Sequence, residues 1–294
     1  MNSSEYQQWG EDYYERYPQF RPPKRRSFLQ RFLSRERKWL HILLFVLTIL
    51  STYLAVGSVV YSVAIMAILL AHEMGHYLTC RRYGIPATLP YFIPMPWSPF
   101  GTLGAVIAMG NIMPNRRALF DVGAAGPLAG LVLAFPATVI GLKYSTVINP
   151  AELGGAALSM GEPLAFQFLR YLILGPLPEG MDVLVHPLAY AGWVGLFVTA
   201  LNLLPVGQLD GGHIAYALFG EKSKYVYFAA LGGFAVATFF FPGWILMLLL
   251  LAFFFLRHPP TMADYIPLDR KRKILGAVMF VIFVVSFTPV PFHL

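Results

Sequence analysis

The stretch ILLAHEMGHYLTC (Ile68–Cys80) places His72, Glu73 and His76 at the end of a long apolar run. The whole run, Leu40–Cys80, has 41 residues, and Glu73 is its only member that is charged at pH 7. Since a membrane span needs about 20 apolar residues, the run predicts two spanning helices. A carboxylate and two imidazoles are costly in hydrocarbon, which indicates that these side chains have a function there.

The composition agrees with a membrane protein. The chain has 294 residues, of which 57% are hydrophobic and only 13% are charged, so it is far more apolar than an ordinary soluble domain. Beyond the first run, which turns near Gly57, five further apolar runs follow: Ala118–Leu142, Leu188–Leu204, Tyr225–Phe241, Gly243–Leu256 and Ile274–Val290. Because one of these is short, we expect an all-α polytopic membrane protein with six to seven transmembrane helices.

The distribution of basic residues predicts the orientation. With the N-terminus in the cytoplasm, every one of the 22 Lys and Arg residues except Lys143 and Arg170 falls on the cytoplasmic side. The net charge of +7 therefore indicates topology and contact with anionic lipids of the bilayer. A nucleic-acid role would need a soluble basic face, so no nucleic-acid partner is expected.

The chain divides into three predicted regions. Residues 1–39 form a cytoplasmic tail, disordered over 1–25, followed by a basic interfacial segment. That segment, Arg26–Trp39, is either a short interfacial helix or only a positive flank of the first span. Residues 40–257 form the membrane core, and residues 258–294 form a cytoplasmic loop and an extra C-terminal transmembrane helix.

The segment Tyr83–Asn115 is unusual, because it has no charged residue in 33 positions but carries six prolines. Prolines exclude one long helix, and irregular backbone at membrane depth is tolerated only where it lines a protein-walled cavity. We expect a loop that dips into the membrane between the second and third spans. Within it, Gly101–Gly110 is β-prone and could pair with an extended substrate chain. A hydrophobic loop packed on the helices is the alternative.

His72 and His76 are four residues apart and share one helix face, with Glu73 beside them. This is the H-E-x-x-H pattern of zinc hydrolases, in which two imidazoles bind the metal and the carboxylate is the general base. The alternative is a hydrogen-bonded polar cluster without metal.

Catalytic zinc needs a third protein ligand. One candidate acid, Asp121, can pair with Arg117 instead. Asp210 lies in NLLPVGQLDGGH (Asn202–His213), where proline and glycines interrupt the fourth apolar run on the same side of the membrane as His72. Asp210 is the preferred third ligand, and His213 is the alternative.

The chain resembles the site-2 proteases, which are intramembrane zinc metalloproteases, from about Val56 to Pro260. The resemblance rests on HEMGH, GTLG in the dipping loop, AGPLAG (Ala125–Gly130) and NLLPVGQLDGG. It implies that transmembrane proteins are cut near the cytoplasmic side. The implied site residues are the zinc ligands His72, His76 and Asp210, the general base Glu73, and the residues Asn202, Gly101, Thr102 and Gly104 near the substrate or its oxyanion.

The loop Lys143–Val185 is too short for the PDZ domain of larger members. The chain is therefore similar to the compact PDZ-free branch of bacteria, archaea and plastids, and the plasma membrane of a prokaryote is its expected location. Two alternatives remain. One is a CAAX-processing type of hydrolase, whose third ligand would be a glutamate such as Glu221. The other is a non-proteolytic membrane receptor or transporter that retains the fold.

Overall fold

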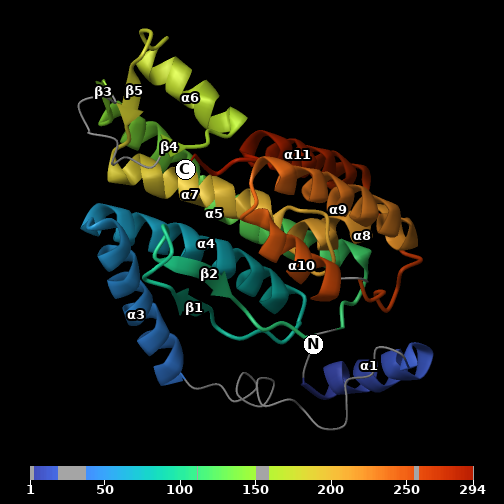
Figure 1. Cartoon of the computed structure of the whole chain (residues 1–294). Coiled ribbons are helices and arrows are strands. Elements are labelled where there is room, and N and C mark those ends of the chain that lie inside the picture. The colour runs from blue at the N-terminus through green and yellow to red at the C-terminus, as the bar shows by residue number, and fades with distance from the viewer. Residues whose placement is uncertain (1–2, 19–37, 111, 150–158, 255–257, 294) are drawn as a thin grey trace.

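The computed structural model describes residues 3–18, 38–110, 112–149, 159–254 and 258–293, which are mostly helical (Figure 1). The helices are α1 (Ser3–Arg16), α3 (Lys38–Val56), α4 (Val59–Arg82), α5 (Arg116–Lys143), α6 (Leu164–Leu174), α7 (Pro187–Asn202), α8 (Asp210–Phe219), α9 (Ser223–Phe240), α10 (Trp244–Phe254) and α11 (Arg270–Ser286). The strands are β1 (Tyr91–Pro94), β2 (Thr102–Val106), β3 (Thr146–Ile148), β4 (Ser159–Met160), β5 (Asp182–Leu184) and β6 (Phe292–His293).

Four stretches of the described residues are long and apolar enough to cross a membrane. They are α3, α4, α5 and Asp210–Phe240, which contains α8 and α9. α7 is also apolar but shorter. The expected helical membrane core is thus confirmed in part, while the count of six to seven spans remains a prediction.

In α3, apolar side chains are exposed and polar side chains are buried, which is the reverse of a helix on the surface of a soluble protein. Its exposed side chains include Ile42, Val46 and Leu50, whereas Thr48 and Ser51 are buried. Such an arrangement fits a helix whose outer face meets lipid and whose inner face makes hydrogen bonds. The turn to α4 follows at Gly57, which has a φ of 71°, at the place where the sequence predicts it.

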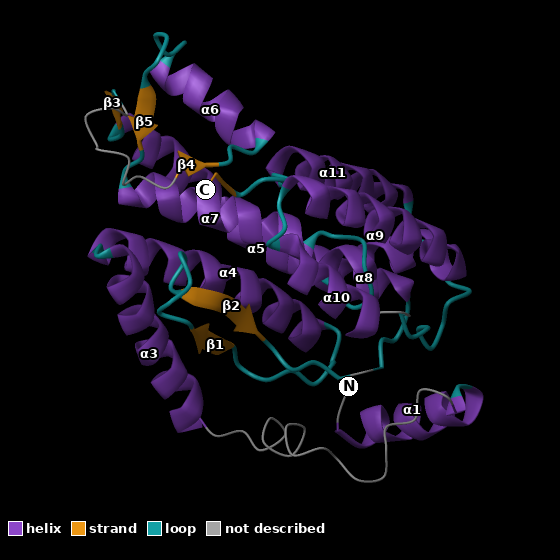
Figure 2. Ribbon diagram, in the orientation of Figure 1, coloured by secondary structure: helices purple, strands orange, loops and turns teal. Residues whose placement is uncertain are grey.

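The helices α4, α5 and α7 run side by side through the centre of the molecule, and α8 packs on α5 (Figure 2). Glycines allow the closest approach between α5 and α7. A Cβ on Gly141 would lie 2.1 Å from the backbone nitrogen of Ala189, and one on Gly192 would lie 2.2 Å from Oγ1 of Thr138. Small residues permit such close packing of helices in a membrane.

Between α3 and α4 lies a two-stranded antiparallel hairpin, β1–β2 (Figure 2). Tyr91 pairs with Val106 and Phe92 with Ala105. The β-prone character of this segment is therefore confirmed over Thr102–Val106. That the segment dips into a membrane remains a prediction.

The described part of the long segment between α5 and α7 carries α6 and the strands β3, β4 and β5. β3 pairs with β5, and β4 pairs with β6 near the end of the chain. Ser159 lies opposite His293, and Met160 lies opposite Phe292. The last described residues therefore lie beside β4, just before α6.

The prediction of a disordered N-terminal tail is wrong for Ser3–Arg16, which form α1. Tyr13 donates a hydrogen bond of 3.0 Å to the carbonyl oxygen of Pro260, and Arg16 donates one of 3.3 Å to that of Met262. These contacts dock α1 on the loop that precedes α11. The predicted interfacial segment Arg26–Trp39 lies almost entirely outside the described residues.

Asp121 does not pair with Arg117 as the sequence analysis suggested. Its carboxylate accepts hydrogen bonds of 2.7 and 2.6 Å from Arg272 of α11 and one of 2.5 Å from the hydroxyl of Tyr83. Arg117 instead donates to the carbonyl oxygen of Pro267. The partner was missed because Arg272 is 151 residues away in the sequence.

Candidate metal centre

The two histidines of the candidate site lie on consecutive turns of α4. This helix begins after Ser58, whose hydroxyl accepts a hydrogen bond from the backbone nitrogen of Tyr61. His72, Glu73 and His76 are 4%, 6% and 5% exposed, so all three lie inside the protein. A four-residue spacing brings the two imidazoles to one face of the helix.

Asp210 is the first residue of α8, and the break after α7 sets its position. Gly207 has a φ of 54°, a conformation that favours glycine. A Cβ on Gly211 would lie 2.0 Å from the carbonyl oxygen of Leu203, and one on Gly212 would lie 2.3 Å from that of Gly207. The two glycines after Asp210 therefore let the start of α8 pack tightly against the end of α7.

His72, His76 and Asp210 form one compact group of potential metal ligands. The Nε2 atoms of the two histidines are 3.2 Å apart, and each lies 3.3 Å from Oδ2 of Asp210. Ligand atoms that bind one tetrahedral zinc ion at about 2.0–2.1 Å lie about 3.3 Å from one another. The spacing and the chemistry of the three atoms therefore fit zinc.

The helix α5 orients the histidine rings. The carbonyl oxygen of Val122 lies 2.8 Å from Nδ1 of His76. Since a carbonyl only accepts, Nδ1 carries the proton and Nε2 is left as the metal-binding atom.

Two glycines of the AGPLAG motif make room for the imidazoles. A Cβ on Gly126 would lie 2.0 Å from Nε2 of His76, and one on Gly130 would lie 3.3 Å from Nδ1 of His72. The sequence analysis used this motif only for its resemblance to a family. That these glycines lie against the histidine rings depends on how α4 and α5 are aligned, and the sequence alone does not predict this alignment.

Glu73 is buried, yet its side chain makes no hydrogen bond within the described part of the chain. Its carboxyl group is close enough to His76 and Asp210 to interact with both electrostatically. A carboxylate beside the metal ligands that has no hydrogen-bond partner is available to accept a proton.

Asn202, the last residue of α7, also reaches the site. Its Nδ2 lies 3.2 Å from Nε2 of His72. The amide of Asn202 therefore lies next to one of the three potential ligand atoms.

His213, the alternative third ligand, has a different partner. Its Nδ1 lies 2.7 Å from Nε2 of His258, and Nδ1 of His258 lies 2.6 Å from the carbonyl oxygen of Pro259. Burial lowers the pKa of His258 to about 3, so this ring is neutral at pH 7. A neutral His258 that donates from Nδ1 must accept at Nε2, and His213 is therefore its donor. The sequence offered no signal for this pair.

Gly101, Thr102 and Gly104 do not belong to the metal cluster but shape the hairpin. The hydroxyl of Thr102 donates to the carbonyl oxygen of Ile93 and accepts from the backbone nitrogen of Gly104, both at 2.9 Å. Gly101 and Gly104 have φ values of 71° and 97°. Among the described residues, β2 pairs only with β1, so its second edge has no strand partner.

Comparison with known proteins adds independent information. The model of peptidase family M50 matches residues 60–241. The probable zinc metalloprotease EGY1, chloroplastic, of Arabidopsis thaliana is 32% identical over 247 residues, which cover 77% of this chain and 42% of that protein. The probable zinc metalloprotease EGY2, chloroplastic, of Oryza sativa subsp. indica is 40% identical over 163 residues, which cover 53% and 28%. The chain thus spans less than half the length of these relatives.

Proposed function

Because the chain belongs to peptidase family M50, the site-2 protease family, we propose that it is a zinc metalloendopeptidase that hydrolyses transmembrane proteins within the membrane. One observation carries the proposal. Three ligand atoms spaced for one zinc ion lie beside a buried carboxylate without a hydrogen-bond partner in the described structure, on helices apolar enough to span a membrane.

The residues of the site divide the chemistry among them. His72, His76 and Asp210 would hold zinc, which when bound polarises a carbonyl group and lowers the pKa of water. Glu73 accepts the proton of the attacking water and passes it to the leaving amine. Asn202 donates a hydrogen bond to the carbonyl oxygen of the scissile bond as negative charge develops there.

We propose that cleavage occurs near the cytoplasmic side. His72 follows the start of α4 by 13 residues, or about 20 Å along the helix. In a hydrocarbon core about 30 Å thick, this depth is inside the membrane but closer to the cytoplasmic boundary. The charge distribution supports a cytoplasmic N-terminus, and we expect the plasma membrane of a prokaryote as the location.

A helical substrate hides its peptide bonds in its own hydrogen bonds, so it must unwind locally before cleavage. The unpaired edge of β2 offers backbone groups that could hold such an extended segment. Transmembrane protein segments are therefore the proposed substrates.

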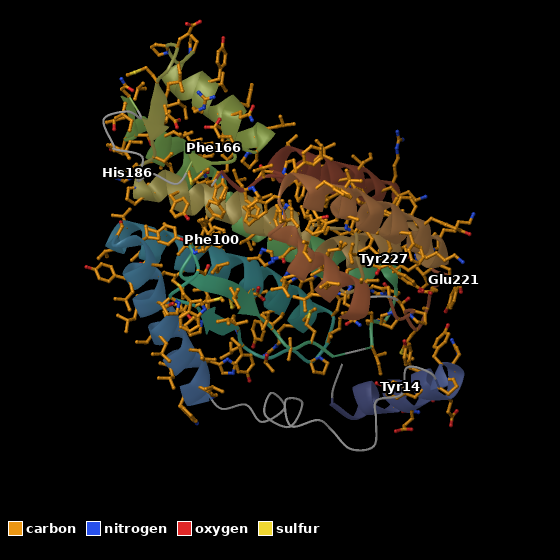
Figure 3. The ribbon with its side chains drawn as sticks, in the orientation of Figure 1. Tyr14, Phe100, Phe166, His186, Glu221 and Tyr227 are labelled. Atoms are coloured by element: carbon orange, nitrogen blue, oxygen red, sulfur yellow. The ribbon has the colours of Figure 1, made fainter. Side chains whose placement is uncertain are left out.

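The alternatives from the sequence have weaker support. Glu221, labelled in Figure 3, lies just beyond the C-terminal end of α8. Asp210 is the first residue of that helix. Glu221 is therefore about 16 Å from Asp210 along the helix axis. This distance from the cluster of potential ligands does not favour Glu221 as the third ligand of a CAAX-type hydrolase. A receptor or transporter would not need a carboxylate held beside the metal ligands.

The proposal is tested by comparing membranes that contain the wild-type protein with membranes that contain Glu73→Gln. Peptide termini are labelled and identified by mass spectrometry, and zinc is measured in the purified proteins. We expect Glu73→Gln to keep its zinc and to lose a set of fragments that end within transmembrane segments. If both membranes give the same fragments, the proposed activity is wrong.

A further inference from the structure

Two polar side chains of α3 hold the two strands of the β1–β2 hairpin. Nδ1 of His41 lies 3.0 Å from the carbonyl oxygen of Pro90, the residue before β1. The hydroxyl of Ser51 donates a hydrogen bond of 2.6 Å to the carbonyl oxygen of Gly101, the residue before β2. A carbonyl only accepts, so Nδ1 of His41 carries the proton. Both side chains are buried, at 7% and 4% exposure, where water does not replace a lost partner.

The same helix lies along β1 over its length. The rings of His41 and Tyr91 are 4.0 Å apart, and those of Phe45 and Phe92 are 5.1 Å apart. The other face of α3 is exposed and apolar. Apart from the turn into α4, the inner face of α3 therefore serves mainly to contact the hairpin.

The tip of the hairpin is held by two tyrosines from the central helices. Tyr61 of α4 donates a hydrogen bond of 2.9 Å to the carbonyl oxygen of Phe100, and Tyr190 of α7 donates one of 3.1 Å to that of Pro99. The side chain of Phe100 lies near α7 (Figure 3), where it contacts Trp193. Hydrogen bonds from three helices thus fix β2 relative to α4, which carries the candidate general base.

We propose that His41 and Ser51 are positioning residues, which set the register of β2 against the metal site and so determine which peptide bond of the substrate is cut. This inference rests on the proposed proteolysis and on pairing of the substrate with β2. A shift of one residue along a strand moves the chain by about 3.3 Å and turns each side chain to the opposite face. A hairpin released from α3 should therefore present neighbouring peptide bonds to Glu73.

The test uses full-length protein in membranes and maps the termini of the fragments that depend on Glu73. The variants are Ser51→Ala, which removes the donor to Gly101, and His41→Phe, which keeps a ring against Tyr91 but removes the donor to Pro90. His41→Asn is the conservative variant, because its amide nitrogen can take the place of Nδ1. Thr48→Val is the matched control, since this buried hydroxyl of α3 donates to Leu44 of its own helix.

We expect Ser51→Ala and His41→Phe to keep the wild-type zinc content. Each variant should cut the main site, which is the peptide bond that the wild type cuts, about tenfold more slowly, because each loses one buried hydrogen bond. New cleavage sites should appear one or two residues from the main site. His41→Asn should restore much of the single main site, and Thr48→Val should behave as the wild type.

Three results would overturn the inference. If Ser51→Ala and His41→Phe cut the same bond as the wild type at the same rate, α3 has no positioning role. A uniform loss of rate at an unchanged cleavage site would show that the two residues only stabilise the fold. If no fragment depends on Glu73 even in the wild type, the proposed proteolysis fails, and the inference fails with it.

Discussion

Gly126 is the residue on which the seating of His76 depends most directly. Since an added Cβ would lie 2.0 Å from Nε2 of the ring, Gly126→Ala must displace the imidazole or α5. We expect purified Gly126→Ala to lose most of its zinc and its proteolytic activity, measured by metal analysis and by fragment release. Gly232→Ala is the control, because no atom lies within 4 Å of its added Cβ. Normal zinc in Gly126→Ala would show that the ring can move without leaving the site.

Asn202 should affect the rate of cleavage without affecting the metal. Its amide lies at the ligand atoms but is not itself one of the three proposed ligands. Loss of one oxyanion donor lowers kcat by about 10²–10³-fold in other enzymes. We therefore expect Asn202→Ala to show a fall of that size in kcat with an unchanged zinc content. A change confined to KM would instead assign Asn202 to substrate binding alone.

At the scale of the elements, one charged cluster joins α11 to the central helices. Arg272 donates two hydrogen bonds to Asp121 of α5, and the same carboxylate accepts from Tyr83 at the end of α4. Arg272 also pairs with Asp269, which caps the N-terminus of α11. The contact makes α11 part of the packed structure, although the sequence analysis placed it outside the membrane core.

We expect Arg272→Leu to destabilise the protein by about 1–2 kcal/mol, because it leaves Asp121 without its charged partner while both groups are only about a quarter exposed. Thermal unfolding in detergent should show a lower midpoint, while the zinc content of the folded protein stays normal. Arg270→Leu in the same helix is a suitable control. An unchanged midpoint would mean that the charge pair is screened and that apolar packing holds α11.

For the whole molecule, the pairing of β4 with β6 indicates which parts of the chain lie on the same side of the membrane. β4 and β6 bring the last described residues beside Ser159, three residues before Glu162. We expect accessibility labels at Glu162 and His293 to react from the same, external side, and labels at Gln8 and Asp264 to react from the cytoplasm. Labels at Glu162 and His293 that react from opposite sides would contradict the predicted topology.

Local pattern was sufficient to predict the shared helix face of His72 and His76 and the helical runs, because both depend on spacing within single segments, whereas the assignment of the metal ligands stays a prediction. His72 and His76 share a face of any helix, and the β-prone stretch near Thr102 is strand in the structure. Apart from the approach of Asp210 to the two histidines, the sequence did not predict contacts between distant segments. The partner of Asp121, the pair His213–His258 and the ordered helix α1 all depend on packing. The hydrogen bonds from α3 to the β1–β2 hairpin were missed for the same reason.

The metal content of Asp210→Ala tests the proposed site most directly, because the two histidines follow from a familiar motif whereas the third ligand follows from the fold. Wild-type protein should contain about one zinc ion per chain, and Asp210→Ala should lose most of it, since two ligands remain. Asp210→Ala, its parent and the matched variant Asp121→Ala are purified in parallel and analysed by mass spectrometry of metals. Full zinc occupancy in Asp210→Ala would contradict the assignment of Asp210 as a ligand, and a loss of zinc only in Asp210→Ala/His213→Ala would assign the third ligand to His213.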